Sequence, residues 1–536
     1  MSPDSSYKKA AYSARAIFLF QIVGSLLGLF RQILYAFFFG TGRRIEAFFA
    51  ATTITNVSTK LFQTGALSNV FLPIFMEAKQ KDAKMAWKLT SNLLTLLLLA
   101  SGFLCCALFL AAPRVVPFFV PGFGAEQKNL IVLLFRIILP TILLDILSTL
   151  MSAVLHANRC FVAVEIASFF GNVLMVILLF LLTRKIGIVA LAVSLLSASL
   201  AQTLLLAATL WREGFRFYIG LSLQQEELLR ILKFMTPFFG YMVVMQIQAI
   251  LTTAVLSFLP QGSLSAVRYG SDFFTRLVPL ISLPFSTVIF SDFSELALSQ
   301  ASEMKERFVI MLRKSLQMLM FLTVPLTVLT IAFRVPMVQA IYQRGIFDRT
   351  SVWMTSRVFA LFCIGFFFES ATLIFKKLLF AFKKNYAVVA IASAGQLVYL
   401  FFLFVFVKFL GYLGIAAASS LSTFVLLVMM VGYVHAKVFS LSSLSRDSSA
   451  SFFKMVVAGV VMGFSCLGLN RLFEGFHLWA ASNLTHFLQT ATLCLVGLAA
   501  YLVVSWVFHI EELRIVWSVY DLHGFWRRWV RGGYAA

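Results

Sequence analysis

Three charged residues recur at four-residue spacing inside one apolar stretch of the chain: Arg268, Asp272 and Arg276. Residues four apart lie on the same face of a helix, so these three form one stripe with a net positive charge. Guanidinium groups match phosphate oxygens in bidentate fashion. The stripe therefore predicts a wet cavity that holds a polyanionic head group, with Asp272 positioning the two arginines. A self-neutralised structural triad is the alternative.

A second group of polar residues lies nearer the N-terminus. Arg31 stands well inside the apolar run 16–40, where a charge costs about 2.5–3.5 kcal/mol and is tolerated chiefly in a wet cavity or beside a partner. The next run carries hydroxyl, amide and ammonium groups, namely Thr52, Thr53, Thr55, Asn56, Ser58, Thr59, Lys60, Gln63 and Thr64. A helix that faces lipid would not carry so many hydrogen-bonding groups. We expect Asn56, Thr59 and Lys60 to contact a sugar-bearing head group; polar contact between helices is the alternative.

Five other charged residues in apolar runs have simpler explanations. Arg136 and Arg357 lie near span ends, which predicts that their side chains extend to the membrane surface. Asp145, Glu165 and Glu369 could couple the movement of protons or sodium, but the sequence offers none of them an evident partner. We expect these three acids to be structural.

The elements that position these side chains must lie in a membrane. Hydrophobic residues make up 60% of the 536 residues, whereas a soluble globular core stops growing at about 250–300 residues. The net charge of +22 lies in short connections, which indicates control of membrane topology and argues against nucleic-acid binding. Apolar runs of about 17–25 residues can cross a bilayer. The predicted spans number about fourteen: 16–40, 45–76, 87–112, 129–155, 160–183, 186–210, 231–258, 264–291, 308–333, 352–380, 386–408, 411–436, 452–472 and 484–508.

Charge asymmetry and internal repetition organise these spans. One side of the membrane collects more than twice as many Lys and Arg as the other, which places both termini in the cytoplasm. Short motifs recur in order at offsets of 220, 225 and 227 residues, the last relating Gly187 to Gly414. We expect an all-α polytopic membrane protein with two six-helix lobes, as in many alternating-access transporters. The predicted divisions are lobes at 1–220 and 221–440, then a terminal helix pair and cytoplasmic tail at 441–536, with a linker at 440–451.

The sequence has no arrangement of residues typical of catalysis. It contains no P-loop, no Ser-His-Asp pattern that can be argued and no Asp-rich loop for a metal and a sugar nucleotide. Its six cysteines have neither metal-ligand nor disulfide spacing. We expect a transporter and not an enzyme, with no cofactor and no metal, and we exclude a pump that hydrolyses its own ATP.

Five motifs follow one another along the chain: Gly24 to Arg31 (GSLLGLFR), Glu46 to Phe49 (EAFF), Gly65 to Pro73 (GALSNVFLP), Ala112 to Phe123 (APRVVPFFVPGF) and Tyr342 to Asp348 (YQRGIFD). In this order they resemble the MviN/MurJ lipid II flippases of the MOP exporter superfamily. The resemblance implies fourteen helices in two six-helix lobes plus a terminal pair. It implies that lipid II, an undecaprenyl-pyrophosphate-linked disaccharide-pentapeptide, is moved from the cytoplasmic to the periplasmic leaflet of the bacterial inner membrane for peptidoglycan synthesis. Membrane lipids and cell-wall synthesis or division proteins are the other partners implied.

The resemblance also assigns site residues. It makes Arg31 the cavity arginine of the first span and Glu46 the acid that precedes Ala-Phe-Phe. Where the family has a basic pair this chain has Thr59 and Lys60, and Asp272 stands where the family has arginine. We expect Arg268 and Arg276, one turn away on either side, to substitute.

Thr252 lies near the position of the family's sodium ligand, so we expect membrane potential to drive transport. Three other functions stay open. They are a related exporter, either an oligosaccharide-lipid flippase or a multidrug extruder; a non-transporting cell-wall scaffold; and an integral-membrane glycosyltransferase, which would need the acidic loop that is missing.

Overall fold

A computed structural model describes residues 3–63, 65–218, 226–298, 302–438, 444–475 and 483–513. Within these ranges the chain forms eighteen α-helices and no strand. In chain order the helices are α1 (Pro3–Phe39), α2 (Arg43–Gln63), α3 (Gly65–Lys81), α4 (Ala83–Phe119), α5 (Ala125–Ile138), α6 (Pro140–Ala157), α7 (Phe161–Ile186), α8 (Val189–Arg212), α9 (Glu226–Ser257), α10 (Ser263–Leu298), α11 (Ser302–Ala332), α12 (Arg334–Tyr342), α13 (Arg349–Ile364), α14 (Phe366–Ala381), α15 (Asn385–Leu410), α16 (Leu413–Lys437), α17 (Leu444–Gly475) and α18 (Asn483–Val507).

The predicted spans correspond to these helices. Each of the fourteen falls on one helix or on two consecutive helices. In the described part of the chain, nine segments are long and apolar enough to cross a membrane, or ten if the bent pair α13–α14 is one span. The protein is therefore an all-α, multi-pass membrane protein, and the count of fourteen crossings stays a prediction. The linker expected at 440–451 is helical from Leu444 onward, and residues 440–443 lie outside the described ranges.

Three predicted segments are broken where the sequence suggested continuous helices. The segment at 45–76 divides into α2 and α3. The segment at 129–155 divides at Pro140, which cannot donate a backbone hydrogen bond to continue α5. The segment at 352–380 bends by 43° between α13 and α14. At that bend the Ser420 hydroxyl of α16 donates to the Leu361 carbonyl at 2.6 Å, which satisfies an acceptor at the break.

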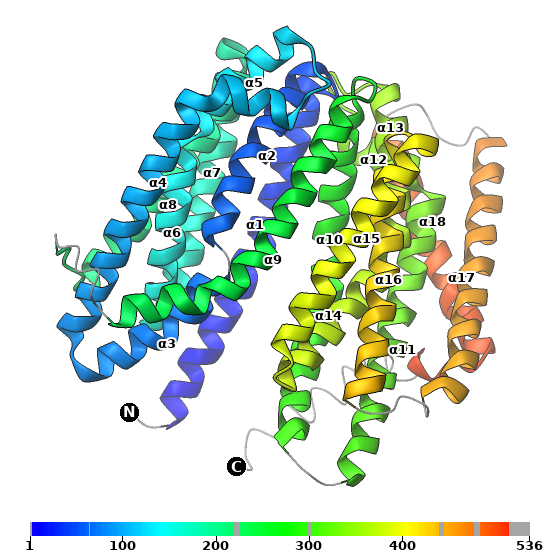
Figure 1. The fold of residues 1–536 in the computed structure, drawn as a ribbon. Helices are drawn as coiled ribbons and strands as arrows, with labels where there is room; N and C mark the ends of the chain where they lie inside the picture. The colour runs from blue at the N-terminus through cyan, green and yellow to red at the C-terminus, as the bar shows by residue number, and fades with distance from the viewer. Residues whose placement is uncertain are drawn as a thin grey trace. The chain divides into compact units, whose positions relative to one another are not determined.

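The helices form two compact units. The first comprises Met1–Tyr269 with Tyr342–Ser351, and the second comprises Gly270–Ile341 with Val352–Ala536. Within the first unit α7 and α8 pack side by side, and within the second α15 and α16 form the corresponding pair (Figure 1). The lobe boundaries expected at 220 and 440 stay a prediction.

The backbone of the two units repeats at a constant offset. Gly187 between α7 and α8 has φ 58° and ψ −134°, and Gly411 between α15 and α16 has φ 58° and ψ −137°. Arg159 before α7 and Lys383 before α15 also have positive φ, at 63° and 56°. Both pairs are 224 residues apart. The internal repeat therefore pairs Gly187 with Gly411, and the sequence match to Gly414 is out of register.

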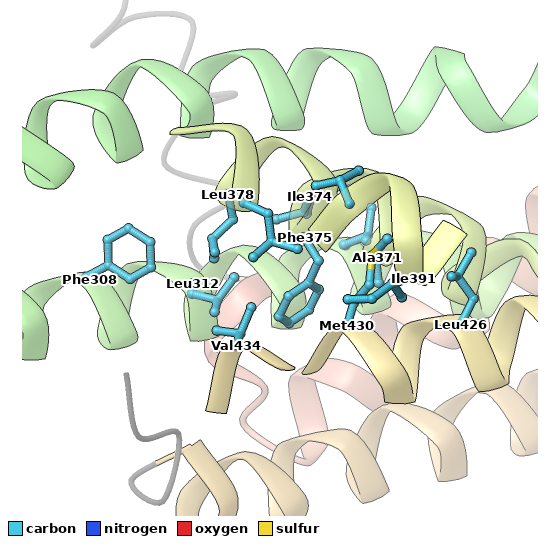
Figure 2. Close-up of a cluster of buried hydrophobic side chains, with 13 residues drawn as sticks. Phe308, Leu312, Ala371, Ile374, Phe375, Leu378, Ile391, Leu426, Met430 and Val434 are labelled. Carbon is cyan, nitrogen blue, oxygen red and sulfur yellow. The ribbon is translucent and has the colours of Figure 1, made fainter. Parts of the chain in front are cut away.

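Apolar packing joins the helices of the second unit. Figure 2 shows one buried cluster, in which Phe308 and Leu312 of α11, Phe375 of α14 and Met430 and Val434 of α16 come together. Leu312 and Met430 are fully buried. A second cluster packs α17 and α18 on α11. Close packing of apolar side chains therefore stabilises this unit, because interdigitated side chains make many favourable dispersion contacts.

Candidate functional site

Arg31 is held inside the first unit with unused hydrogen-bonding capacity. It lies on α1 and is half-buried, and its Nη1 donates to the Met175 sulfur of α7 at 3.3 Å. Its Nε is buried and has no hydrogen-bond partner in the described part of the chain. A thioether is a weak acceptor, and a buried donor without a partner is costly. The described residues therefore leave the hydrogen-bonding capacity of the Arg31 guanidinium incompletely used.

The polar stretch of α2 has an accessible face and a buried face. Thr55 and Thr59 are buried, and their hydroxyls donate to backbone carbonyls one turn back at 3.0 and 3.1 Å. Asn56 and Lys60, four residues apart, are exposed on the other face. An amide and an ammonium therefore form the accessible stripe of this helix. Substrate contact by Asn56, Thr59 and Lys60 stays a prediction.

Two of the predicted cations lie near each other in the first unit. Lys60 of α2 experiences the positive charge of Arg268, which is half-buried on α10. Asp272 and Arg276 are also half-buried and lie one and two turns further along α10, in the second unit. Like charges in one region make it attractive to an anion. The sequence predicted a stripe of Arg268, Asp272 and Arg276 that faces a cavity, and that arrangement stays a prediction.

Glu46 positions the start of α10. Its side chain is only 2% exposed. Its Oε1 accepts the backbone N–H groups of Gly262 at 2.9 Å and Leu264 at 3.0 Å, at the first turn of α10. A carboxylate there satisfies helix donors that would otherwise lack partners and complements the helix dipole. Glu46 therefore fixes the helix that carries Arg268, a role that sequence analysis missed; direct contact between Glu46 and a substrate stays a prediction.

The Tyr342–Asp348 motif also packs within the first unit. The Ile346 N–H donates to the Phe37 carbonyl of α1 at 3.0 Å. Gly345 has φ +60°, and a Cβ on it would collide with that same carbonyl. The Tyr269 ring of α10 lies 5.6 Å from the Phe347 ring. The motif therefore braces α10 against α1, which no local pattern in the sequence indicated.

The remaining intramembrane charges have local partners. The Arg136 Nε donates to the Phe109 carbonyl at 3.3 Å, and its guanidinium lies 4.8 Å from that ring centroid. The guanidinium of Arg357 lies 4.3 Å from the Trp353 ring centroid. Cation–π contacts of this kind stabilise by about 0.5–1 kcal/mol at exposed sites. Each guanidinium thus lies over an aromatic ring, and extension of both side chains to the membrane surface stays a prediction.

Two of the three acids, Glu369 and Asp145, have contacts with neighbouring helices. The Thr423 hydroxyl donates to the Glu369 carboxylate at 3.4 Å. Asp145 of α6 receives a hydrogen bond from the Ser199 hydroxyl of α8. Both contacts join neighbouring helices of one unit, as the structural explanation expects.

Comparison with known proteins extends these observations. The family model described as "Lipid II flippase MurJ" matches residues 35–485. A probable lipid II flippase MurJ of Thermotoga maritima is 24% identical over 519 residues, which cover 95% of this chain and 98% of that protein. The lipid II flippase MurJ of Burkholderia cenocepacia is 26% identical over 355 residues, 65% of this chain and 68% of that protein.

Two solved structures share the fold. A lipid II flippase MurJ in an inward closed conformation superposes with a TM-score of 0.77 at 22% identity, covering 92% of this chain and 99% of that one. An inward-facing MATE multidrug transporter of the MOP superfamily gives 0.63 at 14% identity, covering 79% and 96%. Because the family model spans most of the chain, this protein belongs to the lipid II flippase MurJ family, a family of transporters and not of catalytic enzymes.

Proposed function

We propose that this protein transfers lipid II from the cytoplasmic to the periplasmic leaflet of the bacterial inner membrane by alternating access, with both termini in the cytoplasm. The observation that carries the proposal is Arg31. This chain has an arginine at the family's cavity position, and its buried Nε has no hydrogen-bond partner in the described residues. A diphosphate supplies the acceptors that this guanidinium lacks.

The polar and charged residues of the first unit have different roles in binding the substrate. Arg31, Lys60 and Arg268 supply positive charge for the diphosphate. The exposed amide of Asn56 offers hydrogen bonds to a sugar. Glu46 keeps its carboxylate on the α10 amides and so holds Arg268 in place without neutralising it. The prenyl chain stays in lipid during the whole transfer, because each CH₂ is about 0.8 kcal/mol more stable in an apolar environment than in water.

We further propose that membrane potential drives the cycle. Thr252, near the family's sodium-ligand position, carries a hydroxyl and no carboxylate. One elementary charge that moves through the field gains about 2.3 kcal/mol per 100 mV. Net cavity charge can thus respond to the potential, and collapse of the potential at constant sodium should stop transfer.

The test uses cells depleted of the native protein and complemented with variants. Lipid II is labelled from outside so that only the outer leaflet is read. Arg31→Ala should lose outer-leaflet labelling while protein levels stay normal, because the diphosphate loses its main donor. Arg136→Met, which removes an intramembrane arginine with partners on α4, should keep labelling. Normal labelling and growth with Arg31→Ala would contradict the proposal.

The second candidate is export of another amphiphile, which the likeness to a MATE transporter favours. Purified protein separates the two candidates. Lipid II should raise the unfolding temperature in proportion to its occupancy, and this rise should shrink in Arg31→Ala. Stabilisation by cationic drugs but not by lipid II would favour the extruder, and stabilisation by neither would favour a scaffold.

A further inference from the structure

A cavity of about 830 Å³ with both polar and apolar lining lies wholly within the first unit, where α2 and α5 begin. We call it the α2–α5 pocket and define it by Arg43 and Arg44 of α2, residues 124–127 and Asn129 at the start of α5, and Gln261 before α10. Its volume is that of sites which enclose small organic ligands, about 300–1,000 Å³. A single bound ion would leave most of it unfilled.

The charge of the pocket favours one negative group. Arg43 and Arg44 are exposed at the first turn of α2. α5 begins beside them with Gly124 as its N-cap, which provides no side-chain cap, so the helix presents amides and a partial positive charge. Glu126 adds one exposed carboxylate. Glu46 adds a second carboxylate to the lining, and the two hydrogen bonds that its Oε1 accepts from the α10 amides do not remove its charge. Two carboxylates thus oppose two guanidinium groups, so the pocket, with the partial positive charge at the start of α5, suits no more than one negative charge.

The rest of the lining matches a peptide. Gln127, Asn129 and Gln261 contribute side-chain amides, and Leu130 and Leu133 form an apolar wall. Two of the amides are pre-positioned. The Arg43 Nε donates to the Gln261 side-chain oxygen at 3.1 Å, and the Gln127 amide donates to the Arg43 carbonyl at 3.3 Å.

Primary amides pair well with backbone amides, and leucine side chains accommodate small apolar residues. Positive charge, amides and an apolar wall together match a short peptide that ends in a carboxylate.

We propose that the α2–α5 pocket binds a short peptide with a free C-terminal carboxylate, and that Arg44 receives this carboxylate. The source of the peptide rests on the proposed function, under which the transported precursor carries a pentapeptide. The connections beside the pocket belong to the side with fewer Lys and Arg, which charge asymmetry predicts to be periplasmic. A peptide delivered to that side would meet the pocket after transfer.

The test measures binding to the purified full-length protein. The probes are a soluble synthetic pentapeptide with a free carboxylate, the same peptide as its C-terminal amide, and inorganic pyrophosphate. Arg44→Ala should weaken binding of the acid about tenfold, the usual effect of losing one charged hydrogen bond. Asn129→Trp should block the pocket without changing its charge. Arg114→Ala removes an exposed arginine of α4 outside the pocket and should bind like the unmodified protein.

Several outcomes would overturn the proposal: no binding of the acid, equal binding of acid and amide, full binding by Arg44→Ala or Asn129→Trp, or displacement of the peptide by pyrophosphate. The binding assay needs no transport. If cells with Arg31→Ala transfer lipid II normally while the pocket still binds the peptide, the proposed function fails and the pocket proposal stands with a peptide from another source. If transfer depends on Arg31 but the pocket binds no peptide, the pocket proposal alone fails.

Discussion

Replacement of Glu46 by alanine should loosen the start of α10. The carboxylate accepts two backbone N–H groups, from Gly262 and Leu264, and is almost fully buried. Loss of a helix cap costs about 0.5–2 kcal/mol, and each buried donor left without a partner costs about 1–3 kcal/mol. Water can reach these groups because Glu46 also lines the α2–α5 pocket. We therefore expect the lower part of the combined range, about 2–4 kcal/mol.

Glu46→Gln separates the hydrogen bonds from the charge. The glutamine oxygen can still accept both N–H groups, but a neutral acceptor bonds about half as strongly as a carboxylate. It also loses the interaction with the helix dipole, worth about 0.3–1 kcal/mol. We expect this variant to lose about 1 kcal/mol. Glu126→Ala, an exposed acid at the first turn of α5, is the matched control and should change little.

Hydrogen exchange measured by mass spectrometry gives a local readout of this prediction. The peptide that covers residues 260–266 should exchange faster in Glu46→Ala than in Glu46→Gln, and at the original rate in Glu126→Ala. The unfolding temperature of the purified protein should fall in the same order, by roughly 2–4 °C for the alanine variant. Unchanged exchange of residues 260–266 in Glu46→Ala would refute the assignment of Glu46 to α10, whatever happened to overall stability.

Three further substitutions test other parts of the first unit. Gly345→Ala should destabilise the protein by about 1–3 kcal/mol in thermal unfolding, because φ is +60° and the methyl group meets a carbonyl of α1. Gly124→Ala, where an added Cβ meets nothing within 4 Å, is its control, and equal stability of the two variants would contradict this explanation. Asp348→Ala should cost about 0.5–1 kcal/mol at pH 7, because the Asp348 carboxylate accepts a backbone N–H three residues on at 2.8 Å. The hydroxyl and N–H of that residue hold the pKa of Asp348 below its ordinary value, so its stabilising effect is present above about pH 4 and is lost as pH falls through the lower folded-state pKa; a cost that persists at pH 2 would contradict the capping role. Lys60→Gln should raise stability by up to about 1 kcal/mol, since Lys60 experiences the charge of Arg268, and should reduce stabilisation by lipid II; a loss of stability would show that the two cations do not oppose each other.

Apolar length was enough to locate the helices, because it is a local property of the sequence. Each of the fourteen predicted spans falls on helix. The breaks within spans depended on contacts that the local sequence does not contain. At the bend beside Gly365, the Leu361 carbonyl accepts a hydrogen bond from Ser420, which lies 59 residues further along the chain. The repeat was visible in the sequence, but its register of 224 residues emerged only from backbone angles at Gly187 and Gly411.

The charged residues of the candidate site could be predicted from the sequence, because a charge inside an apolar run is itself unusual. A charge inside an apolar run is costly, so Arg31, Lys60 and Arg268 could be selected without a structure. The role of Glu46 could not be predicted, because its partners are backbone amides 216 and 218 residues away and backbone amides leave no trace in sequence. The α2–α5 pocket was missed for a similar reason. Its arginine and amide side chains come from the start of α2, the start of α5 and the turn before α10, and none of these segments has a distinctive sequence pattern by itself.

The cations of the first unit are better explained by ligand binding than by the stability of the fold. Lys60 and Arg268 repel each other, and Arg31 keeps a buried donor without a partner in the described residues. Neither arrangement stabilises the empty protein, and apolar side chains at these positions would fold at least as well. By contrast, the nearly buried carboxylate of Glu46 accepts two backbone N–H groups. A protein that satisfies the Glu46 carboxylate so fully and leaves an Arg31 donor without an acceptor among the described residues has a charge placed for a ligand, and a diphosphate carries acceptors of that kind.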